Sequence, residues 1–478
     1  MIKFLNFIIL LLINQFQADV YKFGDHNYES LVNVLLKIHS RCINVSRVYT
    51  LDDYLGHNTT SQGRKLYVIE FFDKRLNDRD IKKLPNVKYV SNMHGNEIVG
   101  RELCLKLMDE LCQVYIDEPT YFWKIIGGYR LHIMPSMNPD GYEIAYGLHY
   151  EIKTHTNILR DKSDEWLRGR NNGNNKDLNR NFPNLTQLYL RNYISLLCIP
   201  LDLKYSQREI ETRMVMKWLH DYQFTLSLNF HGGDRVVNYP FDTSEFGTTT
   251  FSPTPDHKTF VRLAKQFVKL APSMKEHHNI PKNQTVPSFY NNNEGITNGA
   301  QCCFELTVEL NEDKFPFSTH KLEKMWKAYK DALLFFPRML KERITVYLDM
   351  NPKYYLFAWM DIYIRIGNDY ALIENPLKMD CRRHYYHRLL APGIYRIKLN
   401  AISSYGFYDD YNQYDFDSFV ISDIESTVET KYFHICIQPN QSRETIIMIS
   451  NDNSLVTVES NFYEENYTNI DDFNMVSV

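Results

Sequence analysis

The sequence has few of the features that mark several classes of protein. Its eight cysteines include no Cys-x-x-Cys pair, so the usual spacing of a cysteine metal site or a redox motif is absent. No block of lysine and arginine stands out, and the formal net charge is −4, which argues against nucleic acid as a partner. With 44% hydrophobic residues among 478, the chain can build a real core and is long enough for two or three domains.

Long apolar runs are scarce as well, and the one that stands out lies at the N-terminus. Lys3 precedes an apolar run over residues 7–13, which is followed by polar residues and by Ala18. The run is too short to span a bilayer and is typical of a secretory signal peptide, so we expect residues 1–18 to be removed after Ala18. No long apolar segment closes the chain, which predicts a protein without a membrane anchor.

Glycosylation sequons and cysteines agree with secretion. The Asn-x-Ser/Thr sequons begin at Asn44, Asn58, Asn184, Asn283, Asn440 and Asn466. An even number of cysteines favours disulfides in an oxidising compartment, and the sequence leaves their connectivity open. We therefore expect a secreted glycoprotein with disulfides, whose oligomeric state the sequence does not determine.

Helical and strand patterns alternate over the first two thirds of the chain. Helices are expected over residues 28–38 and 208–222, and strands over 65–72, 88–92, 131–134 and 224–230. This alternation predicts an α/β domain over residues 24–338, with a sheet flanked by helices on both faces. Ligands of such sheets gather beyond the carboxyl ends of strands.

The residue composition changes near Lys341. Short runs rich in Tyr, Ile, Val and Phe recur over residues 341–438, which predicts a small all-β module. Beyond Arg443 there is no further lysine or arginine, while Asp and Glu accumulate. We expect residues 439–478 to form an acidic, mostly flexible tail.

His94 and Glu97 lie between an apolar run and a helical pattern that begins near Ile98. Three residues apart at a helix start, they can face a common point and supply two of the three protein ligands of a catalytic zinc. A solvated surface pair has the same spacing. His231 ends an apolar strand before two glycines, and it is the natural third ligand.

Two arginines, Arg170 and Arg180, lie in loop-rich segments with several amides. Arginine presents fixed donors that match a carboxylate or a developing oxyanion. Taken singly, each arginine could equally be a surface residue.

Together these segments resemble the zinc metallocarboxypeptidases, in the branch that includes carboxypeptidases E, N, M and D. The matching stretches are His94-Gly95-Asn96-Glu97, residues 135–142, Gly169-Arg170, residues 177–183, His231-Gly232-Gly233, residues 238–242, residues 295–300 and residues 304–310. They run in family order from about Tyr28 to Phe336. The resemblance implies a mixed sheet flanked by helices, and residues 385–395 are similar to a segment of the transthyretin-like domain that accompanies this branch.

The resemblance also implies roles for individual residues. His94, Glu97 and His231 would hold one zinc ion. Glu309 would be the general base, and Arg170 would stabilise the oxyanion. Glu305 shares a strand face with Glu309 and is its rival as the base; Glu309 is chosen because it aligns with the family base.

Substrate contacts follow from the same resemblance. Asn179 and Arg180 would grip the terminal carboxylate of a peptide. Asp242 matches the acid that this branch uses to recognise a basic side chain, which implies peptides or proteins ending in Arg or Lys as substrates. An exposed turn aspartate is the alternative for Asp242.

The sequence departs from the family between Ala300 and Phe304. Only three residues stand where the family carries a longer segment, whose tyrosine closes over the bound substrate. Either an exon was skipped or the protein has lost this segment, and the sharp junction between intact motifs favours the first.

The sequence thus predicts a secreted zinc carboxypeptidase that removes C-terminal Arg or Lys. The alternative is a catalytically impaired peptide-binding protein on the same scaffold, because a lid contributes to turnover and affinity. A zinc amidohydrolase for small acylated amino acids fits Arg180 and Asp242 less well.

Overall fold

A computed structural model describes the greater part of the chain. The described residues are 21–24, 26–52, 56, 58–154, 167–182, 207–240, 253–275, 289–291, 303–316, 318–349, 355–380, 385–403, 428–437, 444–450 and 456–461. The expected signal peptide, residues 1–18, lies outside them. No helix in the described part of the chain is long and apolar enough to cross a membrane.

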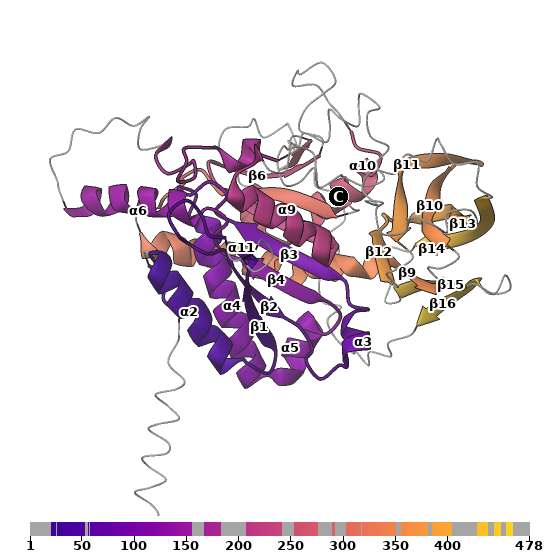
Figure 1. Ribbon diagram of the computed structural model, residues 1–478, viewed down its shortest axis with the longest axis horizontal. Helices are drawn as coiled ribbons and strands as arrows, with labels where there is room; N and C mark the ends of the chain where they lie inside the picture. Colours follow the sequence, from indigo (N-terminus) through magenta and orange to yellow (C-terminus); the bar gives the residue numbers. More distant parts are fainter. Residues whose placement is uncertain are drawn as a thin grey trace, which may run out of the picture.

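A mixed sheet of eight strands forms the centre of the larger unit (Figure 1). Its order is β1 (Ser46–Thr50), β2 (Tyr67–Phe71), β4 (Arg130–Met134), β3 (Asn86–Ser91), β5 (Phe224–His231), β8 (Phe304–Asn311), β6 (Asp234–Tyr239) and β7 (Phe289–Asn291). Strands β4, β3, β5 and β8 are parallel neighbours, whereas β2 and β6 run antiparallel to β4 and β8. The α/β expectation with a mixed sheet is confirmed.

Helices cover both faces of this sheet. The helices are α2 (Tyr28–Arg41), α3 (Asp78–Ile81), α4 (Val99–Asp117), α5 (Pro119–Ile126), α6 (Pro139–Thr154), α9 (Ile210–Tyr222), α10 (His257–Leu270) and α11 (Thr319–Phe335), with short 3-10 turns η2 (Leu178–Arg180), η4 (Pro272–Lys275) and η6 (Phe336–Glu342). Residues of α2, α4, α10 and α11 share one large apolar core with the strands. Residues of α9 belong to a smaller core on the other face, which we call the front face.

Alternation along the strands divides the polar from the apolar residues. Every side chain of β5 is buried; Leu226, Leu228 and Phe230 enter the large core. Because successive side chains of a strand point to opposite faces, Ser227 and His231 face the front. Polar functional residues of the central strands can therefore gather on the front face, while the opposite, back face packs into the large core.

A row of buried ionisable and polar side chains crosses the front face. In register from β2 to β8 the row is Glu70, His132, Lys88, Ser227 and Glu305. All five are at most 2% exposed. We call them the buried row.

Two four-stranded sheets follow the central unit. One has the order β11 (Asp369–Asp380), β10 (Tyr355–Ile366), β13 (Gly393–Ser403) and β14 (Val428–Ile437); the other has β12 (Tyr385–Leu389), β9 (Arg343–Asp349), β15 (Glu444–Ser450) and β16 (Val456–Asn461). These sheets, the β module, appear in orange and yellow in Figure 1. The likeness to a transthyretin-like domain stays a prediction.

Residues 439–478, where a mostly flexible tail is expected, include two strands. Within residues 439–478, β15 pairs in parallel with β9, and β16 pairs with β15. The segment is rich in Ile, Val and Thr, which favour strands. Counting the acidic residues of the segment misses this strand pattern, because the count does not consider which residues alternate with them.

Candidate metal centre

The loop from β3 to α4 is shaped by one asparagine. Asn92 has a φ of 58°, a left-handed conformation that asparagine tolerates better than most residues. Its side-chain Nδ2 donates to the carbonyl oxygens of His94, Gly95 and Glu97 at 3.0, 2.8 and 3.2 Å. A Cβ on Gly95 would lie 2.2 Å from the backbone of Gly141, so only glycine fits there.

His94, Glu97 and His231 come together at the carboxyl ends of β3 and β5. His94 Nδ1 lies 3.1 Å from Glu97 Oε1, and His231 Nδ1 lies 3.0 Å from Glu97 Oε2. One ligand atom from each lies within 4.8 Å of the others, and all three residues are buried. Two imidazoles and a carboxylate are the donor set of a catalytic zinc, so the residues present fit the metal.

The first two ligands precede the helix rather than forming its first turn. Glu97 N donates to His94 O at 3.0 Å, and α4 begins at Val99. A turn, not a helix, therefore sets their approach. The expectation of a helix starting near Ile98 is confirmed to within a residue.

Positive groups surround Glu97. Its Oε2 accepts from the Gly232 backbone N–H at 3.1 Å, and Lys314 Nζ lies 3.0 Å from Oε1. Burial acts to raise the pKa of Glu97, but the charges and hydrogen bonds of His94 and His231 hold it well below its usual range. The carboxylate is thus ionised, as a metal ligand must be.

A second carboxylate orients the first histidine. Asp177 Oδ1 lies 3.3 Å from His94 Nε2, the ring nitrogen that faces away from Glu97. Burial opposes ionisation of Asp177, but the hydrogen bond and charge of His94, with the charge of Arg170, lower its pKa. A carboxylate on the second ring nitrogen fixes the tautomer and orientation of a ligand histidine.

Arg170 lies between these two carboxylates. Its Nη2 is 3.0 Å from Asp177 Oδ2, and its Nη1 is 3.7 Å from Glu97 Oε1. The Arg170 side chain is 23% exposed. A cation held beside the ligands and partly open to solvent can contact a bound substrate.

Glu309 lies on β8 directly opposite His231, so both side chains face the front. Its Oε2 is buried and has no hydrogen-bond partner. Burial raises the pKa of Glu309 to about 7, which is near the value that suits a general base at neutral pH.

Glu305, the rival base, is engaged elsewhere. Its Oε2 forms an ion pair with Lys88 Nζ, which also donates to Ser227 Oγ at 2.7 Å. Glu305 belongs to the buried row and lies four residues before Glu309, well short of the strand end.

The other expected substrate contacts are described in part. Asn179 and Arg180 lie in η2, next to Asp177, and the Asn179 backbone N–H donates to Asp177 Oδ1 at 2.9 Å. Asn179 Oδ1 is buried without a hydrogen-bond partner, whereas Arg180 is exposed. Asp242 and the first two residues of the short junction, Gln301 and Cys302, lie outside the described residues, whereas Cys303 packs against the smaller core.

Sequence reasoning assigned no role to Asn92, Asp177 or Lys314. Asp177 stood within a matched stretch, and its place two residues before Asn179 was the only signal. Lys314 follows Glu309 by five residues, beyond the end of β8, so its approach to Glu97 depends on how the chain folds back.

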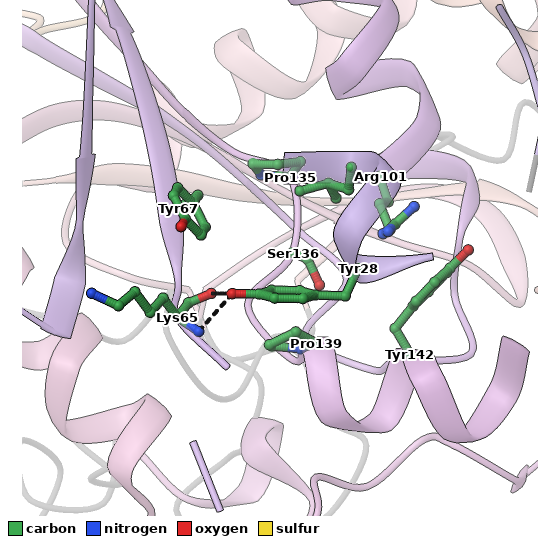
Figure 2. A pocket seen from close by; sticks show the side chains of 9 residues that line it. Tyr28, Lys65, Tyr67, Arg101, Pro135, Ser136, Pro139 and Tyr142 are labelled. Atoms are coloured by element: carbon green, nitrogen blue, oxygen red, sulfur yellow. Dashed lines mark hydrogen bonds between the residues drawn. The ribbon is translucent and has the colours of Figure 1, made fainter. Parts of the chain in front are cut away.

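A separate pocket lies beside α4 and is lined by Tyr28, Lys65, Tyr67, Arg101, Ser136 and Tyr142, among others (Figure 2). Figure 2 shows the Tyr28 hydroxyl pointing at Lys65, whose backbone N–H donates to it at 2.8 Å. The space open to water is about 10 Å³, roughly that of one molecule. None of the candidate site residues lines it.

Comparison with known proteins agrees with this centre. The family described as "Zinc carboxypeptidase" matches residues 34–332. The carboxypeptidase N catalytic chain of Homo sapiens is 35% identical over 423 residues, covering 83% of this chain and 84% of its own length. Residues 1–332 make up a smaller share of the chain than this alignment covers, so the alignment extends into the β module.

Two further proteins are similar. Carboxypeptidase Z of Homo sapiens is 35% identical over 341 residues, covering 66% of this chain and 48% of its own length. The crystal structure of carboxypeptidase A from Helicoverpa armigera has a TM-score of 0.45 and 16% identity, covering 66% of this chain and 73% of that chain. The chain therefore belongs to the zinc carboxypeptidase family, in the branch that holds carboxypeptidases N and Z, and His94, Glu97 and His231 form its zinc site.

Proposed function

We propose that the protein is a secreted carboxypeptidase that removes C-terminal Arg or Lys from peptides or proteins. The observation that carries the proposal is the pairing of the three zinc ligands with Glu309, whose unpartnered carboxylate oxygen faces the front beside His231. A metal centre with an adjacent free base is the arrangement that hydrolysis of an amide requires.

Glu309 handles the protons of the reaction. When bound, zinc polarises the scissile carbonyl and makes water a better nucleophile at neutral pH. Glu309 takes the proton of the attacking water and delivers it to the nitrogen of the leaving residue. Burial raises the pKa of Glu309, which makes its carboxylate a stronger base than that of an exposed glutamate.

Arg170, Asn179 and Arg180 position the substrate. Arg170 is held by Asp177 beside Glu97 and stabilises the negative charge that develops on the attacked carbonyl oxygen. Asn179 and Arg180 bind the terminal carboxylate of the peptide, since an amide and a guanidinium supply several donors. Recognition of that carboxylate restricts cleavage to the last residue.

Asp242 selects a basic side chain at the substrate's end. It follows β6 by three residues, and β6 lies antiparallel to β8 with Val236 opposite Glu309. An ion pair with Arg or Lys in a partly closed pocket favours these residues over neutral ones.

The secretory context has two supports. A disulfide joins Cys42, just after α2, to Cys112 in α4, and disulfides persist in oxidising compartments. The sequon asparagines Asn44 and Asn58 are exposed, as glycosylation requires.

The second candidate is a binding protein that hydrolyses peptides poorly. The observation in its favour is the short junction between Ala300 and Phe304, where three residues replace the longer segment of the family. Loss of a closing lid lowers both turnover and affinity.

A peptide panel separates these candidates. The zinc-loaded protein is incubated with three peptides that differ only in a final Arg, Lys or Leu, and the released amino acid is measured. We expect release of Arg and Lys, and Asp242→Asn should lower kcat/KM for the Arg peptide about 10- to 100-fold, the worth of one charged hydrogen bond, with little change for Leu.

Each other outcome is decisive. Equal release of Leu and Arg by the unmodified protein would contradict basic specificity. Stoichiometric zinc without release from any peptide supports the second candidate, and insertion of the longer family segment after Ala300 should then restore cleavage.

A further inference from the structure

The β module reaches into the larger unit through one buried arginine. Arg388 lies on β12 and is 0% exposed. Its Nη2 lies 2.6 Å from Oδ1 of Asp256, whose side chain is 3% exposed. Because both charges are removed from water, their relative position is tightly constrained.

Asp256 marks the start of α10. Asp256 is the N-cap residue, directly before His257, the first residue of the helix. Its backbone oxygen accepts a hydrogen bond from the Phe260 N–H. A carboxylate at a helix N-terminus interacts favourably with the helix dipole. Arg388 therefore fixes the first turn of α10 from outside the larger unit.

Arg388 also reaches the first residue of β8. Its guanidinium lies over the Phe304 ring, 5.2 Å from the ring centre. Phe304 packs against Phe260 of α10 at 5.2 Å, and Phe260 stacks on Tyr239 at the end of β6. One side chain of the β module thus holds α10 and β8 together, and through α10 it reaches β6.

These contacts all lie on the back face of the strands. Phe304 and Tyr239 enter the large core, whereas Glu309 on β8 and Asn238 on β6 face the front. Since alternate residues of one strand point to opposite faces, the packing behind β8 and β6 sets where the front residues lie. The pairing of Asn238 with Thr307, and of Val236 with Glu309, transmits any displacement to the site.

We propose that Arg388 is a positioning residue for the substrate site, which makes the β module part of the active-site framework. The proposal rests on the proposed function, because its main readout is peptide hydrolysis. Removal of Arg388 lets α10 and β6 move relative to β8, which displaces the front-face residues Asn238 and Glu309 relative to each other. The zinc ligands on β5 and the β3–α4 loop have no contact with Arg388 among the described interactions and keep their metal.

The test uses the full-length zinc-loaded protein and two variants of the pair, Arg388→Met and Asp256→Asn. Arg262→Gln is the matched control: Arg262 lies on the same helix and pairs with Glu342 in η6, but it is further from the helix start. Kinetic constants for a peptide ending in Arg are measured per zinc-loaded molecule. Hydrogen exchange of the β6 and β8 amides is measured in parallel.

Both pair variants should raise KM at least fivefold while kcat stays within about twofold, and β6 amides should exchange at least tenfold faster. The control should leave both quantities within twofold. A KM and an exchange rate no more altered than in Arg262→Gln would overturn the proposal. If Arg388→Met does not fold, Asp256→Asn alone decides by the same criteria.

The exchange readout separates this inference from the proposed function. If the unmodified protein releases no Arg, the function fails, yet faster β6 exchange in the pair variants still supports positioning by Arg388. Unchanged exchange overturns the inference whether or not peptides are cleaved.

Discussion

The zinc site and the buried row lie on the same face of the same sheet, and both contain histidine, carboxylate and lysine. In the buried row the charges are paired within the protein: Lys88 with Glu305, and Glu70 with Arg130 at 2.6 Å. At the zinc site His231 Nε2 and Glu309 Oε2 are buried without hydrogen-bond partners.

The two clusters differ in where they lie and in what surrounds them. Buried polar atoms without partners cost free energy unless a ligand satisfies them. The buried row lies in mid-strand, whereas the zinc site lies where parallel strands end and loops diverge. Neither composition nor unpartnered atoms separate the two clusters, since Glu305 Oε1 in the buried row also lacks a hydrogen-bond partner. The convergence of three metal-ligand types, His94, Glu97 and His231, at the strand ends does separate them.

The largest effect is expected from removing a zinc ligand. His231→Ala should lower kcat/KM at least about 1,000-fold, since the metal stabilises several kcal/mol of developing charge. Metal analysis should find zinc lost from this variant. Retention of stoichiometric zinc would show that His231 belongs with the structural residues.

The next effect tests Glu309 against Glu305. Glu309→Gln should lower kcat about 100- to 10,000-fold, as loss of a general base does, while zinc content stays unchanged. Single-turnover measurements on zinc-loaded protein give the rate of the chemical step. Full activity in this variant would contradict the assignment of the base.

Lys88 should matter for stability rather than chemistry. Lys88→Met leaves Glu305 buried and unpaired, so unfolding in urea should show a loss of about 3–5 kcal/mol. The double variant with Glu305→Leu should recover most of that loss, because no charge stays buried. A loss of zinc without a loss of stability would break the distinction between the two clusters.

The smallest effect is expected on the stability of the protein at acidic pH. Burial lowers the pKa of His132 to about 3, against about 6.5 in an unfolded chain. The unfolded state therefore binds a proton that the folded state does not, and stability falls as the pH drops below about 6.5. Unfolding measured at pH 7 and pH 5 should differ less in His132→Gln, by about 1–2 kcal/mol. An equal pH dependence in both proteins would show that His132 does not carry this effect.

The family and the zinc ligands could be predicted from the sequence because the residues that carry the chemistry lie in short stretches. His94 and Glu97 are three residues apart, and strand alternation placed Glu305 and Glu309 on one face. The same alternation could not choose between these two carboxylates. Their partners distinguish the two carboxylates. Lys88, more than two hundred residues from Glu305 along the chain, pairs with Glu305 and leaves Glu309 available.

Asp177 and Arg388 show where sequence reasoning stopped. Asp177 acts through a contact with His94 across 83 residues, and Arg388 through one with Asp256 across 132. The strands at 444–461 were missed for a related reason, since their pairing with β9 spans about a hundred residues.

From the sequence alone, local periodicity indicated the α/β character, and short matched stretches indicated the family and the three zinc ligands. Glu309 was preferred to Glu305 as the candidate base only through the family resemblance. The pairing of the buried charges, the carboxylate that orients His94 and the contacts of the β module with α10 and β8 became visible in the folded protein. Those features depend on side chains from distant segments meeting in a low-dielectric interior, where a partner a few ångströms away determines whether a charge is structural or available.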